Sequence, residues 1–263
     1  MKFFTVNDLS ASYGKHKILS HLSFETNASE TIGILGANGS GKTTLLKAIC
    51  GILPHTGTCK IEGNLLEGKN PKQLARLCSY IPQRSGISID ISVLDTVLMG
   101  CYPHLGMLEH PSPDMKNHAM ELIGMVGLAG KENVNYLHLS EGQKQLCILA
   151  RTLITNSKLL LLDEPESALD FHHRYQMLKL IKNWNRNKHS TALISLHDPM
   201  LALNTCDCLL LLSDGDIHAT LHPQTDTLSG MEEKLCHLYG DISLQHCTNK
   251  HGQKQIVMLG ESF

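Results

Sequence analysis

The sequence predicts an α/β fold built around a parallel sheet. Runs that are apolar at every position, such as residues 159–162 and 209–212, are typical of strands buried on both faces. Helical segments separate these runs, and strands that alternate with helices favour parallel pairing. A third observation places a ligand at the sheet, because the glycine-rich segment 36–43 stands between a β-prone run and a helix.

Each element is predicted from its own local pattern. The expected elements are, in order, strands over residues 3–9 and 18–24 around a turn at 13–15, a strand over 31–35, a helix over 42–49, a strand over 79–82, a mostly helical stretch from about 93 to 155, and strands over 158–162, 191–195 and 208–212. A helical segment precedes each of the last two strands. The tail from residue 217 is expected to hold turns, one helix over 231–238 and two strands.

Composition excludes several classes of protein. With 263 residues, 42% hydrophobic and 18% charged, the chain suits one large domain or two small ones and is not disordered. The 23 Lys and Arg against 25 Asp and Glu disfavour a basic nucleic-acid binder. The longest aliphatic runs fall far short of the roughly 20 residues that span a bilayer. The N-terminus lacks an apolar signal-peptide core, so a cytosolic location is expected.

The cysteines are expected to be reduced thiols. There are nine of them, with no CxxC pair, and the closest two are Cys206 and Cys208. Without an export signal this pattern favours buried thiols over disulfides or a zinc site. The 16 histidines are scattered, and the pair His172-His173 is expected to begin a solvated helix.

One glycine-rich segment has the residues of a phosphate-binding loop. It matches G-x-x-x-x-G-K-[ST] and reads Gly36-Ala37-Asn38-Gly39-Ser40-Gly41-Lys42-Thr43. Glycines let successive backbone N–H groups point at one anion, and the following helix adds its positive dipole end. Lys42 is expected to reach the β- and γ-phosphates and the Thr43 hydroxyl to ligate Mg²⁺.

An acidic pair follows the apolar run at 159–162. Asp163 and Glu164 stand at the carboxyl end of a predicted strand, the edge where ligands of open α/β sheets bind. Asp163 is expected to hold Mg²⁺ through its water shell, and Glu164 to take a proton from an attacking water, a step that contributes typically about 10²–10⁴-fold. A strand followed by a helix N-cap is the alternative. The phosphate loop favours the magnesium site.

Four further segments complete a recognisable set. Ser140 and Gln143 have capping-box spacing, which predicts the start of a helix. Ser167-Ala168-Leu169-Asp170 follows the acidic pair, and Gln83 and His197 each follow a predicted strand. With these segments, the sequence resembles the ATP-binding subunit of ATP-binding-cassette (ABC) transporters. The resemblance covers nearly the whole chain, with six motifs in the family's order.

The resemblance implies a P-loop NTPase fold. Its RecA-like core would carry a parallel sheet, an N-terminal antiparallel β subdomain and an inserted helical signature subdomain at about residues 84–155. The nucleotide-binding domain would cover residues 1–240. Residues 241–263 would form a short extension that packs on this domain or trails from it.

The resemblance also assigns residues by position. The implied nucleotide contacts are Tyr13, Gly36, Ala37, Asn38, Gly39, Ser40, Gly41, Lys42, Thr43 and Thr44. Tyr13 would stack on adenine; a packed hairpin tyrosine is the alternative. The implied magnesium residues are Thr43, Gln83 and Asp163, and the implied catalytic residues are Lys42, Glu164 and His197. Ser140, Gly142 and Gln143 would contact ATP held by the opposite subunit, and Asp170 would communicate between the two sites.

The implied function is ATP hydrolysis with Mg²⁺ that drives a membrane importer. Two copies would sandwich ATP head to tail and act on integral membrane permease subunits at the cytoplasmic face. An extracytoplasmic substrate-binding protein would take part indirectly, and nucleic acid is not an expected partner. Segment 95–106 resembles the subfamily that serves ferric siderophores, haem and cobalamin, although Cys101 stands where that group commonly has Arg.

Other functions remain open at this level. Zinc and manganese importers use closely related ATPases, and an iron–sulfur assembly ATPase is a non-transport alternative. A small-molecule kinase would use the same loop. It conflicts with the segment of Ser140, Gly142 and Gln143, which is the signature segment that the resemblance implies. Glu141 also departs from the family, which commonly has Gly there; a carboxylate roughly 8 Å from the γ-phosphate would repel it by at most about 2 kcal/mol. The Glu141 side chain is expected to point to solvent, so turnover should be retained.

Overall fold

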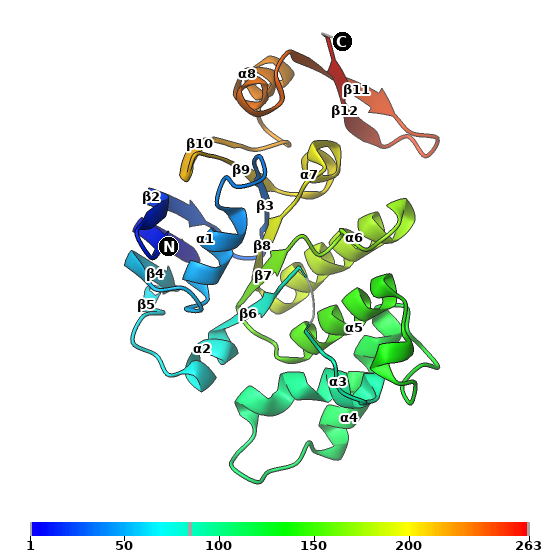
Figure 1. Cartoon of the computed structure of the whole chain (residues 1–263). Helices are drawn as coiled ribbons and strands as arrows, with labels where there is room; N and C mark the ends of the chain where they lie inside the picture. Colours follow the sequence, from blue (N-terminus) through cyan, green and yellow to red (C-terminus); the bar gives the residue numbers. More distant parts are fainter. Residues whose placement is uncertain (1, 84–85, 262–263) are drawn as a thin grey trace.

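The computed structural model describes residues 2–83 and 86–261. Its largest sheet has six strands, in the spatial order β10 (Asp216–Leu221), β9 (Cys208–Ser213), β3 (Thr31–Leu35), β8 (Thr191–Ser195), β7 (Leu159–Asp163) and β6 (Cys78–Ile81). The pairs from β9 to β6 are parallel, and β10 is antiparallel at one edge (Figure 1). The predicted α/β fold with a parallel sheet is therefore confirmed.

The two faces of this sheet bury two separate cores. On β7, Leu160 and Leu162 belong to one hydrophobic cluster, whereas Leu159 and Leu161 belong to the other. Successive side chains of a strand point to opposite faces, so an all-leucine strand serves both cores at once. This is why the run at 159–162 is apolar without alternation.

One core lies between the central sheet and an antiparallel sheet. The antiparallel sheet has the order β2 (His16–Thr26), β1 (Phe4–Tyr13), β4 (His55–Ile61) and β5 (Asn64–Leu65). Helix α1 (Lys42–Ile49) contributes Leu45, Leu46 and Ile49 to this core, and these side chains are at most 1% exposed. The predicted helix over 42–49 and the antiparallel N-terminal subdomain are confirmed.

The other core holds the helical middle of the chain. The elements there are α3 (Val93–Leu98), the 3₁₀ helix η1 (Met99–His104), α4 (Pro113–Met125), the 3₁₀ turn η2 (Tyr136–His138) and α5 (Glu141–Ile154). They lie together at the bottom of Figure 1, below the central sheet. The mostly helical stretch from 93 to 155 is confirmed. Residue 84, where the inserted subdomain was predicted to begin, lies outside the described residues.

At Gly100, η1 packs closely against α5. A Cβ atom at this position would lie 2.0 Å from the carbonyl oxygen of Arg151 and 2.4 Å from Ile154. Neither a backbone carbonyl nor a buried neighbour can move far enough in a close-packed interior. The contact therefore requires glycine and fixes how η1 docks on α5.

The C-terminal residues pack on the core that holds the helices. Helix α8 (Leu228–Tyr239) leads into the hairpin β11 (Ile242–Thr248) and β12 (Lys254–Gly260), beside α7 (Pro199–Thr205) (Figure 1). The Asn204 amide donates to the carbonyl of Ile256 and accepts from its N–H, both at 2.8 Å. As far as residue 261, the tail is a packed hairpin; residues 262–263 of the predicted extension lie outside the described residues.

Some elements differ from the sequence prediction. The structure adds β4, β5, β10 and the helix α2 (Pro71–Leu77), and β1 runs to Tyr13 rather than ending at residue 9. The described part of the tail has three strands instead of two. β1 carries exposed polar residues between buried ones, and β4 buries only Cys59 and Ile61, so their patterns are less distinct than the leucine runs.

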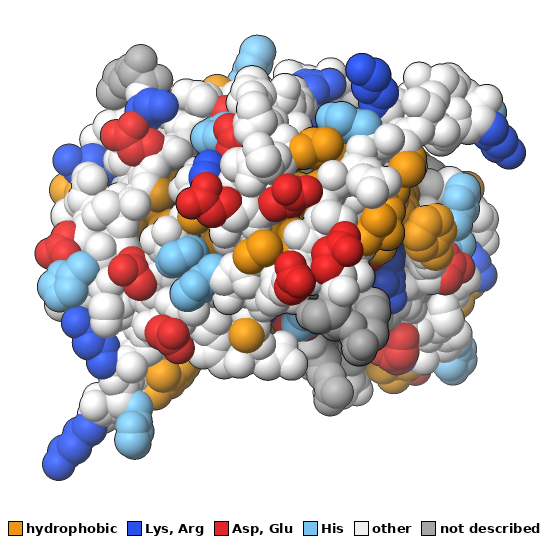
Figure 2. Space-filling view, turned by 90° about the horizontal axis from the view of Figure 1, so that it is seen from above, with side chains coloured by type: hydrophobic (Ala, Val, Ile, Leu, Met, Phe, Trp, Pro, Cys, Tyr) orange, Lys and Arg blue, Asp and Glu red, His pale blue; other side chains and the backbone are white. Residues whose placement is uncertain are grey.

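The surface shows mixed charge. In the view from above, acidic and basic side chains are interspersed over the face that carries the C-terminal hairpin, in keeping with a formal net charge of -2 (Figure 2). Among the helices of the described residues, none is both long enough and apolar enough to cross a membrane. The nine cysteines are all free thiols, as predicted, but only six of them are buried: Cys50 and Cys236 are half-buried and Cys247 is exposed.

Candidate functional site

The glycine-rich segment forms a tight loop between β3 and α1. Gly39 and Gly41 have φ angles of 85° and 107°, in the left-handed region that glycine adopts without steric cost. A Cβ atom at Gly36 would lie 2.3 Å from the carbonyl oxygen of Leu212, so glycine is required there as well. The predicted order of strand, loop and helix is present, and the N–H groups at the start of α1 lie beside the loop.

Lys42 lies against the loop that precedes it. Its ammonium group donates to the carbonyls of Gly36 at 2.7 Å and Ala37 at 3.2 Å, and the residue is only 6% exposed. Burial lowers the pKa of Lys42, and the carboxylates of Glu164 and Asp163 oppose that effect. The side chain is thus held at the loop by its carbonyls, within the field of the acidic pair.

Asp163 is the centre of a buried polar cluster. Its Oδ1 accepts hydrogen bonds from the hydroxyls of Thr43 at 3.0 Å and Ser195 at 2.8 Å. Its Oδ2 accepts from the Tyr80 hydroxyl at 3.2 Å. These groups come from α1, β8 and β6, which surround the carboxyl end of β7. The structure therefore brings Thr43 and Asp163 together, as predicted from segments 120 residues apart.

Glu164 is held in an unusual backbone conformation. Its φ angle of 48° lies in the left-handed region, where side chains with a Cβ are rarely found. Its N–H donates to the Ser195 hydroxyl at 2.9 Å. One carboxylate oxygen lies 2.6 Å from Nε2 of His197, and the other accepts from the Gln83 amide at 2.5 Å. Glu164, His197 and Gln83 thus form a contact group next to Asp163.

Three residues at this site were not predicted. Tyr80 and Ser195 bind Asp163 directly, and Glu166 accepts from the His197 N–H at 3.3 Å. Glu166 is 2% exposed, and its Oε2 has no hydrogen-bond partner among the described residues. Burial raises the pKa of Glu166. The position of Ser195 at the end of an apolar strand was the only signal in the sequence that could have found one of them.

The signature segment is a capped helix start. Ser140 caps α5, since its Oγ accepts from the Gln143 N–H at 3.3 Å while the Gln143 side chain accepts from the Ser140 N–H at 3.2 Å. The predicted capping box is confirmed. Glu141 has an exposed side chain and forms an ion pair with Lys144 at 2.7 Å. The expectation that Glu141 points to solvent is therefore confirmed.

Gly142 brings this segment against the loop that follows the acidic pair. A Cβ atom there would lie 3.1 Å from the carbonyl oxygen of Ala168 and 3.3 Å from Leu169. One residue further, Asp170 caps α6 (Phe171–Lys188) and accepts from the His173 N–H at 3.0 Å. The hydrogen bonds from His173 lower the pKa of Asp170. Ser140, Gly142 and Asp170 thus share one exposed region of the chain.

The remaining predicted residues lie around the loop. Tyr13 is 46% exposed at the end of β1, ahead of a turn at Gly14. Asn38 is exposed, and Ser40 and Thr44 are each 6% exposed. Tyr13 is therefore accessible to a flat ligand.

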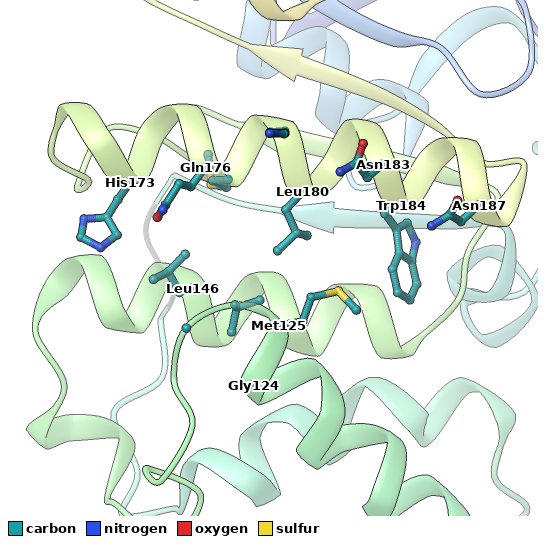
Figure 3. Close-up of a pocket in the computed structure, with 13 residues that line it drawn as sticks. Gly124, Met125, Leu146, His173, Gln176, Leu180, Asn183, Trp184 and Asn187 are labelled. Carbon is teal, nitrogen blue, oxygen red and sulfur yellow. The ribbon is translucent and has the colours of Figure 1, made fainter. Parts of the chain in front are cut away.

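Two hollows in the structure are lined in part by residues of α5. One, of about 580 Å³, is lined by Gln83 together with Glu141, Lys144 and Ser167. The other, of about 670 Å³, separates α6 from α4 and α5, with Leu180 and Trp184 facing Met125 (Figure 3). The second is lined by none of the predicted nucleotide residues, so it lies outside the candidate site.

The fold and this cluster define the class of the protein. A glycine-rich loop joins β3 to α1, which begins with a lysine and a threonine, and an acidic pair follows β7, with β8 between β3 and β7 in the parallel sheet. This arrangement is that of a P-loop NTPase. The family profile described as ABC transporter matches residues 19–167. The chain belongs to the ABC transporter family, in its group of ATP-binding subunits that hydrolyse ATP.

Individual relatives agree with this assignment. An iron chelatin transport ATP-binding protein of Helicobacter pylori is 35% identical over 212 residues, which cover 80% of this chain and 83% of the relative. The hemin import ATP-binding protein HmuV of Enterobacter cloacae is 33% identical over 244 residues, 90% of each chain. A solved metal-chelate type ABC transporter in an inward-facing conformation superposes with a TM-score of 0.82 at 26% identity, covering 99% of both chains.

Proposed function

We propose that this chain is the ATP-hydrolysing subunit of an importer for a metal complex, namely a ferric siderophore, haem or cobalamin. The group formed by Asp163, Glu164, Gln83 and His197 beside the phosphate loop is the observation that supports hydrolysis. The names of the relatives, which concern iron chelatin and hemin, support the cargo class. Cobalamin rests on the sequence resemblance alone.

The residues around the acidic pair suit magnesium. Thr43, Gln83 and Asp163 offer a hydroxyl, an amide and a carboxylate, and Mg²⁺ prefers such oxygen ligands. We assign these three residues to Mg²⁺, which when bound neutralises charge on the phosphates. Lys42 would leave its loop carbonyls to donate to the β- and γ-phosphates. The N–H groups of residues 36–44 would bind the same anion, with Tyr13 on the adenine.

Glu164 and His197 are the proposed hydrolytic pair. Glu164 would accept a proton from the attacking water, and His197 would then donate to the γ-phosphate. In the structure these two side chains contact each other at 2.6 Å, so the carboxylate must exchange a partner when nucleotide binds. Positioning and charge neutralisation supply most of the catalysis in phosphoryl transfer.

A second copy would complete the site. In one chain Ser140 exchanges hydrogen bonds with Gln143, and this exposed helix start offers N–H groups to an anion. We propose that Ser140, Gly142 and Gln143 contact ATP on a partner copy and that Asp170 links the two sites. ATP would then join two copies head to tail, and hydrolysis would release them.

Two substitutions test the proposed hydrolysis and dimer together. Glu164→Gln should bind ATP with Mg²⁺, stop turnover and accumulate as a dimer by light scattering. Lys42→Ala should lose high-affinity ATP binding and stay monomeric, and the double variant should behave like Lys42→Ala. Glu164→Gln that binds ATP but stays monomeric would contradict the dimer. Unchanged nucleotide affinity in Lys42→Ala would contradict the assigned loop.

The partners define the cargo and the location. We propose that the chain associates peripherally with permease subunits at the cytoplasmic face of the membrane, while an extracytoplasmic binding protein delivers cargo. Co-purification with a polytopic permease, followed by ATPase assays with haem-, siderophore-, cobalamin-, zinc- and manganese-loaded binding proteins, separates the cargo classes. Recovery of soluble assembly partners alone would favour the iron–sulfur alternative and contradict the importer.

A further inference from the structure

Three side chains of different chemistry meet in the antiparallel subdomain, away from the nucleotide site. His55 begins β4 and Cys59 lies four residues further along the same strand. The chain returns through β5, where Leu65 pairs with Lys60, and Glu67 lies two residues after Leu65. The His55 nitrogen, the Cys59 sulfur and a Glu67 oxygen lie within 4.8 Å of one another.

The contacts within this group leave one oxygen unused. Glu67 Oε1 accepts from the Cys59 N–H at 2.6 Å and lies 3.2 Å from His55 Nε2. Glu67 Oε2 is buried and has no hydrogen-bond partner among the described residues. A buried carboxylate oxygen without a partner is costly unless a donor or a cation compensates it. The group thus keeps one buried carboxylate oxygen for which no described residue supplies a hydrogen-bond donor.

The group is both enclosed and reachable. Cys59 is fully buried, the His55 side chain is 9% exposed and the Glu67 side chain is 30% exposed. An ion could therefore enter past Glu67 and His55 and meet the thiol at the bottom. Burial raises the pKa of the Cys59 thiol, with Glu67 adding to the effect, so a cation that binds there must displace the thiol proton.

We propose that His55, Cys59 and Glu67 form a site for a divalent cation of the zinc type. Imidazole nitrogen, thiolate sulfur and carboxylate oxygen are the three ligand types that Zn²⁺ takes in proteins, and three protein ligands leave one position for water. The thiolate disfavours Mg²⁺ and Ca²⁺, which prefer oxygen. The site is separate from the proposed magnesium residues, which offer oxygen donors only.

The bound ion would fasten the edge of the antiparallel sheet. β4 pairs with β1, whose end carries Tyr13, and Glu67 lies beyond the two-residue strand β5 at the sheet edge. An ion shared by both segments ties the loop after β5 to β4. A cation that binds the folded chain alone raises its stability according to its concentration and dissociation constant.

Cobalt absorption tests the proposal directly. The full-length chain, freed of metal with a chelator, is titrated with Co²⁺; a thiolate-to-cobalt band in the near ultraviolet and visible bands of tetrahedral cobalt should appear at one ion per chain. Zn²⁺ added afterwards should displace Co²⁺ and remove both the thiolate-to-cobalt band and the visible bands. Cys59→Ser should lose the thiolate band, and His55→Ala and Glu67→Gln should bind Zn²⁺ at least tenfold more weakly. Cys247→Ser, which changes an exposed cysteine on β11, should match the parent chain.

Stability provides a second readout for variants whose affinity is hard to measure. Zn²⁺ should raise the melting temperature of the parent chain and of Cys247→Ser, and should leave those of Cys59→Ser and His55→Ala unchanged. Basal ATPase activity should persist in all of them, since none of these residues lies at the nucleotide site. A thiolate band that survives in Cys59→Ser, or no band in the parent chain, would overturn the proposal.

Discussion

Replacing Ser195 by Ala removes one hydroxyl that holds both members of the acidic pair. Ser195 Oγ donates to Asp163 Oδ1 at 2.8 Å and accepts from the Glu164 N–H at 2.9 Å, and the residue is fully buried. The second bond stabilises a left-handed backbone at Glu164, with φ of 48°. Alanine leaves an N–H without its acceptor and a carboxylate with one donor fewer.

The expected loss of stability follows from these two contacts. A buried hydrogen bond to a charged group contributes about 1.5–3 kcal/mol, and a buried N–H left unsatisfied costs about 1–3 kcal/mol. Because Asp163 keeps its Thr43 and Tyr80 donors, we expect a total of about 2–4 kcal/mol. For a chain of this size that corresponds to a melting temperature lower by about 4–8 °C. If the looser placement of Glu164 raises the activation free energy of hydrolysis by about 1.4 kcal/mol, kcat falls about tenfold.

Denaturant unfolding and steady-state ATPase assays measure both effects. Ser190→Ala is the matched control, because Ser190 is 1% exposed and donates one buried hydrogen bond to Asn185 at 3.0 Å, at the opposite end of β8 from Ser195. The control should lose stability and keep kcat. If Ser195→Ala loses stability but keeps kcat within about twofold, Ser195 does not position Glu164. If Ser195→Ala is as stable as the parent chain, the two hydrogen bonds of Ser195 do not contribute as proposed.

Three further substitutions test other parts of the structure. Glu141→Gly should change ATPase activity by less than about tenfold, because the Glu141 carboxylate is exposed and paired with Lys144, and the roughly 2 kcal/mol repulsion is an upper value; a larger increase in kcat would contradict the solvent-pointing side chain. Burial raises the pKa of Glu166 above its ordinary 4.5, so the folded chain keeps a proton that the unfolded chain has lost, and stability should fall as pH rises from about 4.5 through the raised pKa. Glu166→Gln should flatten that fall in urea unfolding at about pH 5 and about pH 8, whereas Glu121→Gln, on an exposed side chain, should not. Gly100→Ala should destabilise the fold by about 2–3 kcal/mol because its Cβ would lie 2.0 Å from a backbone carbonyl of α5, while Gly124→Ala, with open space around it in α4, should not; equal melting temperatures for the two would refute the close contact.

Local patterns were sufficient where the signal is short-range. The loop between β3 and α1 requires glycines and a lysine in a fixed order, and the capping box of α5 joins residues three apart, so both could be predicted. The leucine run of β7 has no polar residue because it is buried on both faces. β4 was missed because it buries only Cys59 and Ile61 and therefore has no long apolar run.

The sequence by itself determined the alternation of strands and helices, the phosphate loop and the acidic pair, since each is written in neighbouring residues. Only the tertiary structure decided what surrounds them. Tyr80 and Ser195 reach Asp163 from positions 83 and 32 residues away, and His55, Cys59 and Glu67 converge because β5 turns the chain back beside β4. Such contacts depend on how strands pair across the sheets. The contacts of Tyr80 and Ser195 with Asp163 join strands far apart in the sequence, so no local window of residues contains them.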